Sequence, residues 1–228
     1  MDGRKKRIAL YGGTFDPVHI GHIAVAHGLS KLFALDEVLF VPAALAPHKR
    51  ESKVTPAFHR YAMLALATQH EPLMRISTIE LDAPERPYTF ETLARMQEDV
   101  GSEAQLFFVM GADSWMEITT WREWERVLTL TNHIVVARPG YEWDALHVTP
   151  EIRERIVDLR GGADAERMAR EIDSSERAKI YITDAVNIDV SATMIRRAVR
   201  QGLDTDWLRL VTTSVADYIR KYGLYREA

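Results

Sequence analysis

The eleven-residue string Gly12–His22 carries the clearest chemical signal in this sequence. It follows a short apolar run, and adjacent glycines at the carboxyl end of a strand allow backbone N–H groups to approach a ligand closely. His19 and His22 stand three positions apart at the expected start of a helix, so both imidazoles can point toward one place. A helix N-terminus favours anions, and imidazoles beside it can donate hydrogen bonds to phosphate oxygens. The string therefore predicts a phosphate site. The alternative interpretation is a tight turn in which the two histidines have no function.

A second candidate anion site lies far along the chain, at Ser191–Arg196. Ser191 can cap a helix, and Thr193 adds a hydroxyl and an N–H group in the first turn. Arg196, one turn later, can reach a phosphate with its planar guanidinium. Taken alone, the segment fits an ordinary capped helix. Paired with Gly12–His22, it predicts the second half of a triphosphate clamp.

A third piece is the loop Val41–Lys49, which leaves the second apolar run through two prolines. Proline fixes its own φ, so we expect a stiff loop that carries the Lys49 ammonium toward anions at the same edge of the sheet. The alternative is an isolated lysine that is simply solvated.

The elements that must position these residues are indicated by short apolar runs that alternate with segments of helical period. The runs are rich in Val, Ile, Leu and Phe, which suits strands buried on both faces of a parallel sheet. The expected strands are Ile8–Tyr11, Val38–Val41, Met74–Leu81, Gln105–Met110, His133–Ala137 and Lys179–Thr183. The expected helix caps are Thr55, Thr89, Thr149 and Ser191, and the expected helix stops are Gly202 and Gly223. This alternation predicts an α/β sheet with right-handed crossovers.

The chain is expected to form one domain over residues 1–228. Residues 1–7 are interpreted as a solvated basic lead-in to the first strand. A charged stretch that is poor in apolar runs predicts a helix near 150–160 and then a surface excursion over 160–178. A last helix is expected over Leu208–Tyr222.

Composition excludes several classes of protein. The 228 residues include 29 Lys and Arg, 33 Asp and Glu, and no Cys, for a formal charge of −4. Without cysteine there is no disulfide framework, thiolate zinc site or cysteine nucleophile. An acidic balance disfavours extended binding to nucleic acid. No apolar stretch reaches membrane-spanning length, and no apolar segment follows the basic start, so we expect a soluble, cytoplasmic protein.

Taken together, the pieces resemble the nucleotidyltransferase superfamily that is marked by an H-x-G-H signature, here His19–His22. Within it, the chain resembles the bacterial nicotinate-nucleotide adenylyltransferase family over nearly its whole length, and the Tyr88-Thr89 and Trp121 elements narrow the resemblance. The segments that carry it are Gly12–His22, Pro47–Lys49, Arg60–Leu64, Tyr88–Leu93, Phe108–Asp113, Trp121–Trp124, Arg138–Gly140 and Ser191–Arg196.

The resemblance implies a Rossmann-like fold, in which a doubly wound, mainly parallel sheet has helices on both faces and C-terminal helices. It implies that ATP and nicotinate mononucleotide are the substrates, and that the products are deamido-NAD and pyrophosphate. The acceptor phosphate is already an anionic nucleophile, so catalysis consists mainly of positioning and charge neutralisation. Mg²⁺ would be held mainly by phosphate oxygens. No nucleic acid or membrane partner is implied, and a homo-oligomer is left open.

The resemblance also assigns roles to residues. The expected catalytic groups are His19, His22, Lys49 and Arg196. The expected ATP-binding residues are Gly12, Gly13, Thr14, Phe15, Gly111, Asp113, Ser191 and Thr193. The expected acceptor-binding residues are Tyr88, Thr89, Trp121 and Arg138. Without the resemblance, Trp121 and Trp124 at helical spacing favour a place in the core, and Arg138 could equally pair with a surface carboxylate.

Three alternatives follow from the same residues. Class I aminoacyl-tRNA synthetases also carry the His19–His22 signature, but this length leaves no room for an anticodon-binding domain. A related enzyme of the same fold could use nicotinamide mononucleotide, phosphopantetheine, or glycerol phosphate with CTP. A non-catalytic nucleotide sensor is the third alternative, and the full set of two histidines, Lys49 and Arg196 argues against it.

Overall fold

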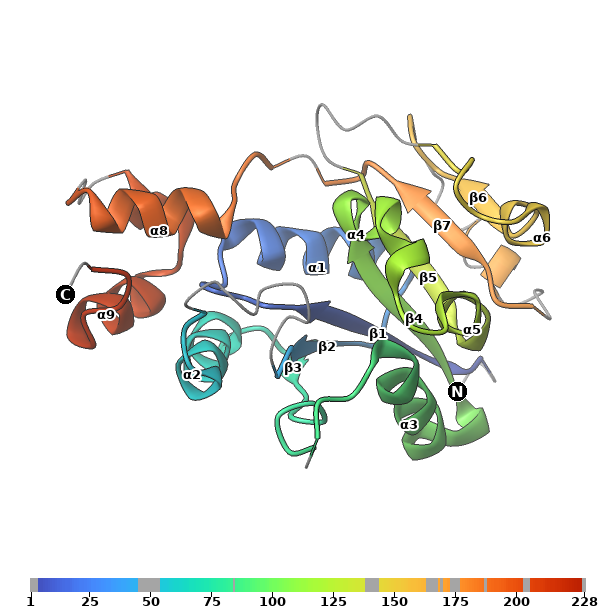
Figure 1. The fold of residues 1–228 in the computed structure, drawn as a ribbon, viewed down its shortest axis with the longest axis horizontal. Coiled ribbons are helices and arrows are strands. Elements are labelled where there is room, and N and C mark those ends of the chain that lie inside the picture. The colour runs from blue at the N-terminus through green and yellow to red at the C-terminus, as the bar shows by residue number, and fades with distance from the viewer. Residues whose placement is uncertain are drawn as a thin grey trace.

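The structure of the chain is a computed structural model, which describes residues 4–44, 54–83, 85–137, 144–162, 168, 170–172, 177–186, 188–202 and 206–226. Within these residues, seven strands form one sheet in the order β3-β2-β1-β4-β5-β7-β6, and every neighbouring pair is parallel (Figure 1). The strands are β1 (Lys6–Gly13), β2 (Glu37–Pro42), β3 (Met74–Ile76), β4 (Ala104–Gly111), β5 (Asn132–Val136), β6 (Ile156–Asp158) and β7 (Ile180–Thr183). The prediction of a doubly wound parallel sheet is confirmed.

Helices cover both faces of the sheet because alternate residues of each strand point to opposite sides. On β1, Ala9 packs in one buried cluster with α1, α2, α8 and α9, whereas Ile8 and Leu10 pack in the other with α3, α4, α5 and α6. The helices are α1 (Ile20–Leu32), α2 (Ala57–Thr68), α3 (Thr89–Val100), α4 (Ala112–Met116), α5 (Trp124–Leu130), α6 (Pro150–Arg153), α8 (Ala192–Arg200) and α9 (Thr213–Lys221). Three 3₁₀ turns are η1 (Gly101–Glu103), η2 (Ile118–Thr120) and η3 (Trp207–Leu210). None of the described helices is long and apolar enough to cross a bilayer.

Two predicted elements were wrong in extent or type. The strand expected over Met74–Leu81 ends at Ile76, because the chain then turns and Asp82 N donates to Thr78 O at 2.8 Å. The helix expected near 150–160 is only the four residues of α6, and the chain continues into the edge strand β6, which pairs with β7. A strand of three residues is too short to show a periodic signal.

The helix caps were predicted with mixed success. The side chains of Ser191 and Thr149 each accept a hydrogen bond from the backbone N–H three residues later in the chain, as expected for a helix cap. Thr55 is not a cap, because α2 begins after Pro56, and its carbonyl instead accepts a bond from a side chain. Thr89 lies inside α3, whose cap is Tyr88 with Glu91 as its capping partner. The cap of α2 is therefore one residue later than predicted, at Pro56, and the cap of α3 is one residue earlier, at Tyr88.

The last expected helix is two elements, η3 and α9, which are separated at Thr212, the cap of α9. Both expected stops are confirmed, because Gly202 has φ +68° and Gly223 has φ +61°. This left-handed conformation ends a helix, and glycine adopts it without a steric cost.

The segment 160–178 is not only a surface excursion. Among its described residues, Met168 and Ile172 have exposed fractions of 2% and 1% and belong to a buried cluster. Residues 168 and 170–172 are helical. Two apolar residues four positions apart on a helix share a face, and this is the signal that anchors the segment to the core.

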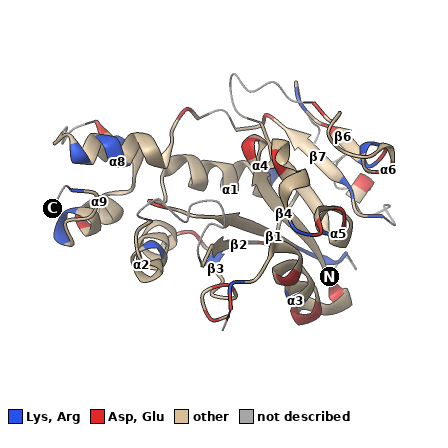
Figure 2. Cartoon of the chain, in the orientation of Figure 1, with Lys and Arg blue, Asp and Glu red and all other residues tan. Residues whose placement is uncertain are grey.

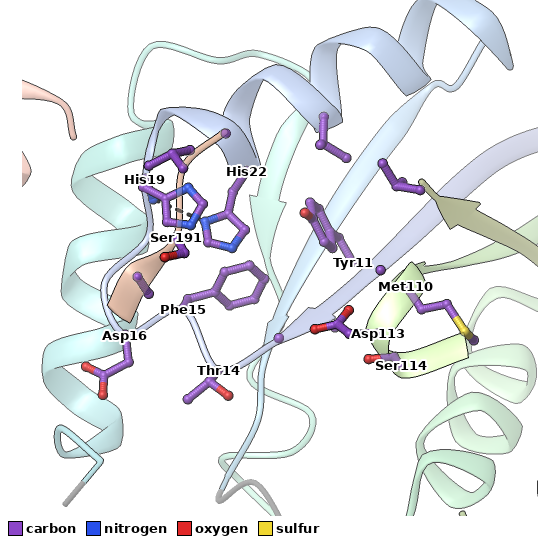
Figure 3. Close-up of a pocket in the computed structure, with 18 of the residues that line it drawn as sticks. Tyr11, Thr14, Phe15, Asp16, His19, His22, Met110, Asp113, Ser114 and Ser191 are labelled. Atoms are coloured by element: carbon purple, nitrogen blue, oxygen red, sulfur yellow. Dashed lines mark hydrogen bonds between the residues drawn. The ribbon is translucent and has the colours of Figure 1, made fainter. Parts of the chain in front are cut away.

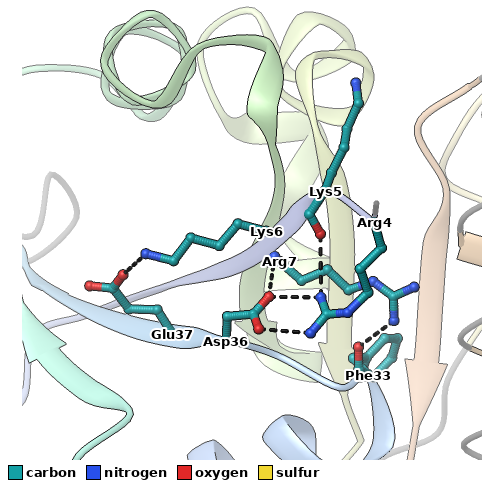
Figure 4. Close-up of polar contacts among 7 residues, drawn as sticks. All are labelled: Arg4, Lys5, Lys6, Arg7, Phe33, Asp36 and Glu37. Carbon is teal, nitrogen blue, oxygen red and sulfur yellow. Dashed lines mark hydrogen bonds and ion pairs between the residues drawn. The ribbon is translucent and has the colours of Figure 1, made fainter. Parts of the chain in front are cut away.

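The predicted solvated lead-in is correct only in part, because Arg4, Lys5 and Lys6 are exposed but Arg7 is buried, and the run makes several polar contacts (Figure 4). Arg4 makes two hydrogen bonds to the Asp36 carboxylate, at 2.7 and 2.8 Å, and these bonds lower the pKa of that carboxyl. Lys6 pairs with Glu37 at 2.6 Å. Arg7 is fully buried, and its Nη1 donates to Phe33 O at 2.9 Å. The run therefore ties the first strand to the start of β2.

Basic residues gather at the C-terminal ends of α8 and α9 (Figure 2). Arg197 and Arg200 lie in the last turn of α8, and Arg220 and Lys221 in that of α9. Cations stabilise this negative end of a helix. The cluster thus has a local structural reason within an acidic molecule.

Candidate active site

The strand order reverses between β1 and β4, and the carboxyl ends of these two strands open into a cleft. Ligands of doubly wound sheets bind at such a reversal. Two cavities of about 640 and 450 Å³ occupy it. The residues that line both cavities are Gly12, Gly13, Thr14, Met110, Gly111, Ser114 and Glu117. Two ligands bound in the cavities would therefore meet along one wall.

The two histidines of the Gly12–His22 string face each other at the start of α1 (Figure 3). His19 is the cap residue, its N–H donates to His22 Nδ1 at 3.1 Å, and the two rings stack with centroids 3.7 Å apart. Because Nδ1 of His22 accepts, Nε2 is the nitrogen that carries the proton in the neutral ring. Both side chains line the larger cavity, so the predicted juxtaposition is present.

The turn between the glycines and the helix is held by Phe15. This residue has φ +50°, a left-handed conformation that is costly for a bulky side chain. Its ring is buried and lies 5.0 to 5.7 Å, centroid to centroid, from those of Tyr11, His22 and Phe40. Aromatic packing thus holds the backbone in the turn that passes along the cavity.

Gly21 separates the two histidines for a steric reason. A Cβ atom at this position would lie 2.6 Å from Val190 Cγ1 and 3.1 Å from His19 Nδ1. The glycine therefore lets the segment before α8 pack directly against the start of α1. This contact places the second candidate anion site beside the first.

The Ser191–Arg196 segment forms the opposite wall of the larger cavity. Ser191 caps α8 by accepting from Met194 N at 3.2 Å. Arg196 Nη1 donates to the Asp16 backbone oxygen at 2.7 Å, and its Nη2 donates to Thr193 Oγ1 at 3.2 Å. Ser191, Thr193 and Arg196 all line the cavity, so the two distant segments that are predicted to form a clamp meet at one cavity.

Asp16, which is not among the predicted site residues, lies at the centre of this assembly. Its buried carboxylate accepts from Tyr225 Oη at 2.7 Å and from Thr55 N at 3.2 Å. Burial, and then the charge of Asp16, raise the pKa of Tyr225, which keeps the hydroxyl protonated as a donor. The contact spans 209 positions of sequence, so no local pattern could reveal it.

A carboxylate wall comes from the short helix after β4. Asp113 lines the larger cavity, as predicted, and Gly111 lines both cavities. Ser114 and Glu117 also line both cavities and were missed. Glu117 lies one turn after Asp113, and this spacing is the sequence signal that could have found it.

The smaller cavity holds the predicted acceptor-binding residues Tyr88, Thr89 and Trp121. Trp121 is half-buried and contacts Phe108 edge to face, with ring centroids 6.4 Å apart. Arg122 lies over the Tyr88 ring at 4.7 Å. Trp121 and Trp124 both pack against the same buried cluster, but Trp124 does not line either cavity. The two tryptophans therefore have different environments.

Glu80 is a further residue of the smaller cavity that was missed. It accepts from Thr92 Oγ1 at 3.1 Å and from Ala44 N at 3.4 Å. Burial raises the pKa of its carboxyl, and these hydrogen bonds act in the opposite direction. Glu80 thus connects the loop after β2 to α3.

Most of the predicted site is brought together. The predicted residues that line the larger cavity are Gly12, Gly13, Thr14, Phe15, His19, His22, Gly111, Asp113, Ser191, Thr193 and Arg196. Lys49 and Arg138 lie outside the described residues. Among the described residues, no three His, Cys, Asp or Glu side chains cluster as a metal-binding group.

A doubly wound parallel sheet with two helix starts and two adjoining cavities at its reversal point defines a nucleotide-binding protein of the α/β class. A family model described as cytidylyltransferase-like matches residues 10–198. A probable nicotinate-nucleotide adenylyltransferase of Thermoanaerobacter sp. (strain X514) is 36% identical over 224 residues, which cover 98% of this chain and 96% of the relative. One of Desulfatibacillum aliphaticivorans is 36% identical over 221 residues, covering 96% and 99%.

A solved structure shares the fold. It is the nicotinic acid mononucleotide adenylyltransferase of Plasmodium falciparum complexed with NaAD, with a TM-score of 0.70 and 20% identity over 96% of this chain and 97% of that chain. The chain belongs to the nicotinate-nucleotide adenylyltransferase family, within the cytidylyltransferase-like proteins. The resemblance seen in the sequence is therefore confirmed.

Proposed function

We infer that the chain transfers the adenylyl group of ATP to nicotinate mononucleotide, forming deamido-NAD and pyrophosphate in NAD biosynthesis. The observation that supports this most directly is the pair of cavities that share the wall around Gly12–Thr14. One has the two histidines and the start of α8, which suit a triphosphate. The other has an aromatic lining around Trp121, which suits a pyridine ring. Two nucleotides bound in this way bring their phosphates together.

The reaction needs little covalent chemistry from the protein. An oxygen of the acceptor phosphate attacks the α-phosphorus of ATP, the bond between the α-phosphorus and the bridging oxygen breaks, and pyrophosphate leaves with that electron pair. The nucleophile is an anion already, so no base is required. His19 and His22 would donate hydrogen bonds to the α-phosphate, and Arg196 would neutralise charge that develops on the leaving group. Lys49 is proposed to act with Arg196.

Enzymes of this class generally use a divalent metal with ATP, and we propose that the metal here is Mg²⁺. When bound, the ion would neutralise negative charge on the phosphates. In the described part of the cleft, Asp113 and Glu117 would offer carboxylate oxygens to the ion, whereas the third carboxylate of the larger cavity, Asp16, already accepts from Tyr225 and Thr55. The remaining ligands would be phosphate oxygens and water, as Mg²⁺ prefers.

The preference for the acid over the amide is proposed to come from the start of α3. Thr89 is the first residue of this helix, and it lies in the same cavity as Trp121. Free N–H groups at a helix start bind a carboxylate well, whereas an amide presents two donors of its own. Trp121 would stack on the pyridine ring that carries this carboxylate.

The test is pyrophosphate release with ATP and Mg²⁺, comparing nicotinate mononucleotide with nicotinamide mononucleotide at matched concentrations. We expect a rate at least ~10-fold higher for the acid, the scale of one favourable hydrogen bond to a charged group. Equal rates would contradict the acid preference and the role of Thr89. No release with either acceptor would overturn the proposed reaction.

A further inference from the structure

Arg60 is a buried charge at the edge of the site that the reaction does not use directly. It lies in the first turn of α2 and has an exposed fraction of 1%. Burial lowers the pKa of its guanidinium, and the nearby Asp16 acts in the opposite direction. Burying such a group is costly unless its donors are satisfied. The partners of Arg60 therefore indicate what the burial achieves.

The donors of Arg60 go to backbone carbonyls of three separate segments. Nη1 donates to Thr14 O at 2.8 Å, and Nη2 donates to Ala43 O at 2.7 Å. Nη2 also lies 3.5 Å from Ala44 O, and Nε donates to Thr55 O at 3.0 Å. One side chain thus holds the turn after β1, the loop after β2 and the start of α2 at fixed separations.

The segments that Arg60 holds form the walls of both cavities. Thr14 lines both, and Ala43 lines the smaller one. Ala43 N in turn donates to Gly13 O at 2.9 Å, and Ala44 N donates to Glu80 at 3.4 Å. The backbone at Ala43 and Ala44 is therefore held from the turn, from α2 and from Glu80.

The bond to Thr14 O has a consequence for the turn. In a planar trans peptide, the N–H group points opposite to the preceding C=O group. Fixing the Thr14 carbonyl toward α2 thus also fixes the direction of the Phe15 N–H group. Phe15 is held in a left-handed conformation, so this peptide has little freedom once both constraints act.

Lysine could not replace this arrangement. The guanidinium presents its donors in a rigid planar fork, which suits carbonyls on different segments, whereas an ammonium is a compact point charge. A lysine at position 60 would keep the charge and lose the simultaneous contacts.

We propose that Arg60 is a positioning residue, which sets the separation of the two loops that form the shared wall and so aligns ATP with its acceptor. The proposal rests on the proposed function, because the alignment matters only if both nucleotides bind. It predicts that a change at Arg60 affects both substrates, although Arg60 contacts neither cavity directly.

The test compares Arg60→Lys with Arg7→Lys. Arg7 is the matched control, because it is equally buried, donates to a carbonyl, and lies at the opposite end of β1. Urea unfolding gives the folded fraction, and rates are normalised to it. For Arg60→Lys we expect kcat to fall by at least ~10-fold and both KM values to rise, because small misplacements of reacting groups cost this much. For Arg7→Lys we expect stability to fall and both KM values to stay unchanged.

Binding measured without turnover separates the proposal from the proposed function. Titration calorimetry with a non-hydrolysable ATP analogue should show weaker binding to Arg60→Lys than to the wild type and to Arg7→Lys. If Arg60→Lys loses rate only in proportion to its unfolded fraction, with unchanged KM and binding, the positioning role is wrong. If the wild type itself releases no pyrophosphate while it binds the analogue, the proposed function fails, and unequal binding still supports the positioning role.

Discussion

At the scale of single residues, the stacked pair His19 and His22 carries the most specific expectation. We expect His19→Ala to lower kcat by at least ~100-fold, the scale of losing one donor to a developing charge. The matched control is His27→Ala, which removes an exposed imidazole of the same helix that pairs with Glu71. Steady-state rates with circular dichroism of both variants check this. A His19→Ala enzyme with more than half the wild-type rate would remove His19 from the mechanism.

Trp121 makes a second prediction at this scale. Trp121→Ala should raise the KM for nicotinate mononucleotide far more than the KM for ATP, because it removes an aromatic face from the smaller cavity only. Trp124→Ala is the control, since Trp124 packs on the core and should change stability without changing the ratio of the KM values. An equal rise in both KM values for Trp121→Ala would show that the ring does not stack on the acceptor.

The residues of the site differ in how visible they are in the sequence. His19, His22 and Ser191 could be predicted because their signals are local: a spacing, a glycine pair, a helix cap. Glu80 and Arg60 could not be predicted in their roles, because their partners at Thr92, Ala44 and Thr14 depend on how strands are ordered in the sheet. A single charged residue in a sequence gives no indication of the carbonyl that it will meet.

At the scale of elements, the close packing of α1 against the segment before α8 can be tested through Gly21. Gly21→Ala should lower the free energy of unfolding by roughly 1–3 kcal/mol, because its Cβ would lie 2.6 Å from Val190 Cγ1. Val190→Ala removes that atom, so the double variant should recover part of the loss. Urea unfolding of both single variants and the double variant measures the coupling. Strictly additive losses would mean that Val190 is not what excludes a side chain at Gly21.

The boundaries of helices and strands are predicted less well from the sequence than the elements themselves. The core strands were located because four or more apolar residues in sequence are distinctive, as in Ile8–Tyr11. The edge strand β6 was missed because its three residues follow a correctly capped helix with no visible break. The cap of α3 is Tyr88 and not Thr89, because the Glu91 side chain accepts a hydrogen bond from Tyr88 N.

At the scale of the whole molecule, the buried His133 links stability to pH. It lies in β5, an internal strand between β4 and β7, and its Nδ1 is 2.9 Å from Thr131 O. Burial lowers the pKa of its imidazole to about 4, because the opposing effect of the Thr131 hydrogen bond is smaller and the charge of Arg155 acts in the same direction as burial. In the unfolded chain the ordinary pKa is 6.5. As the pH falls from 6.5 toward 4, only the unfolded state gains the proton, so stability falls with pH over this range and is flat above it.

Urea unfolding at two pH values tests this linkage. Between about pH 7.5 and pH 5, the wild type should lose about 2 kcal/mol more than the neutral variant His133→Gln. The comparison cancels the contributions of other titrating groups, since both proteins share them. Parallel losses in the two proteins would show that His133 is protonated in the folded state or that it is not buried.

The hydrogen bond from Tyr225 to Asp16 also sets an order of events during synthesis, because the chain is made from its N-terminus to its C-terminus. The turn at residues 14–16 is synthesised before strands β2 to β7, and one of its tethers comes 209 positions after Asp16. The Asp16 carboxylate lacks the hydrogen bond from Tyr225 Oη until that residue has been added to the chain. The turn that lines the larger cavity therefore gains this tether only after all seven described strands have been synthesised.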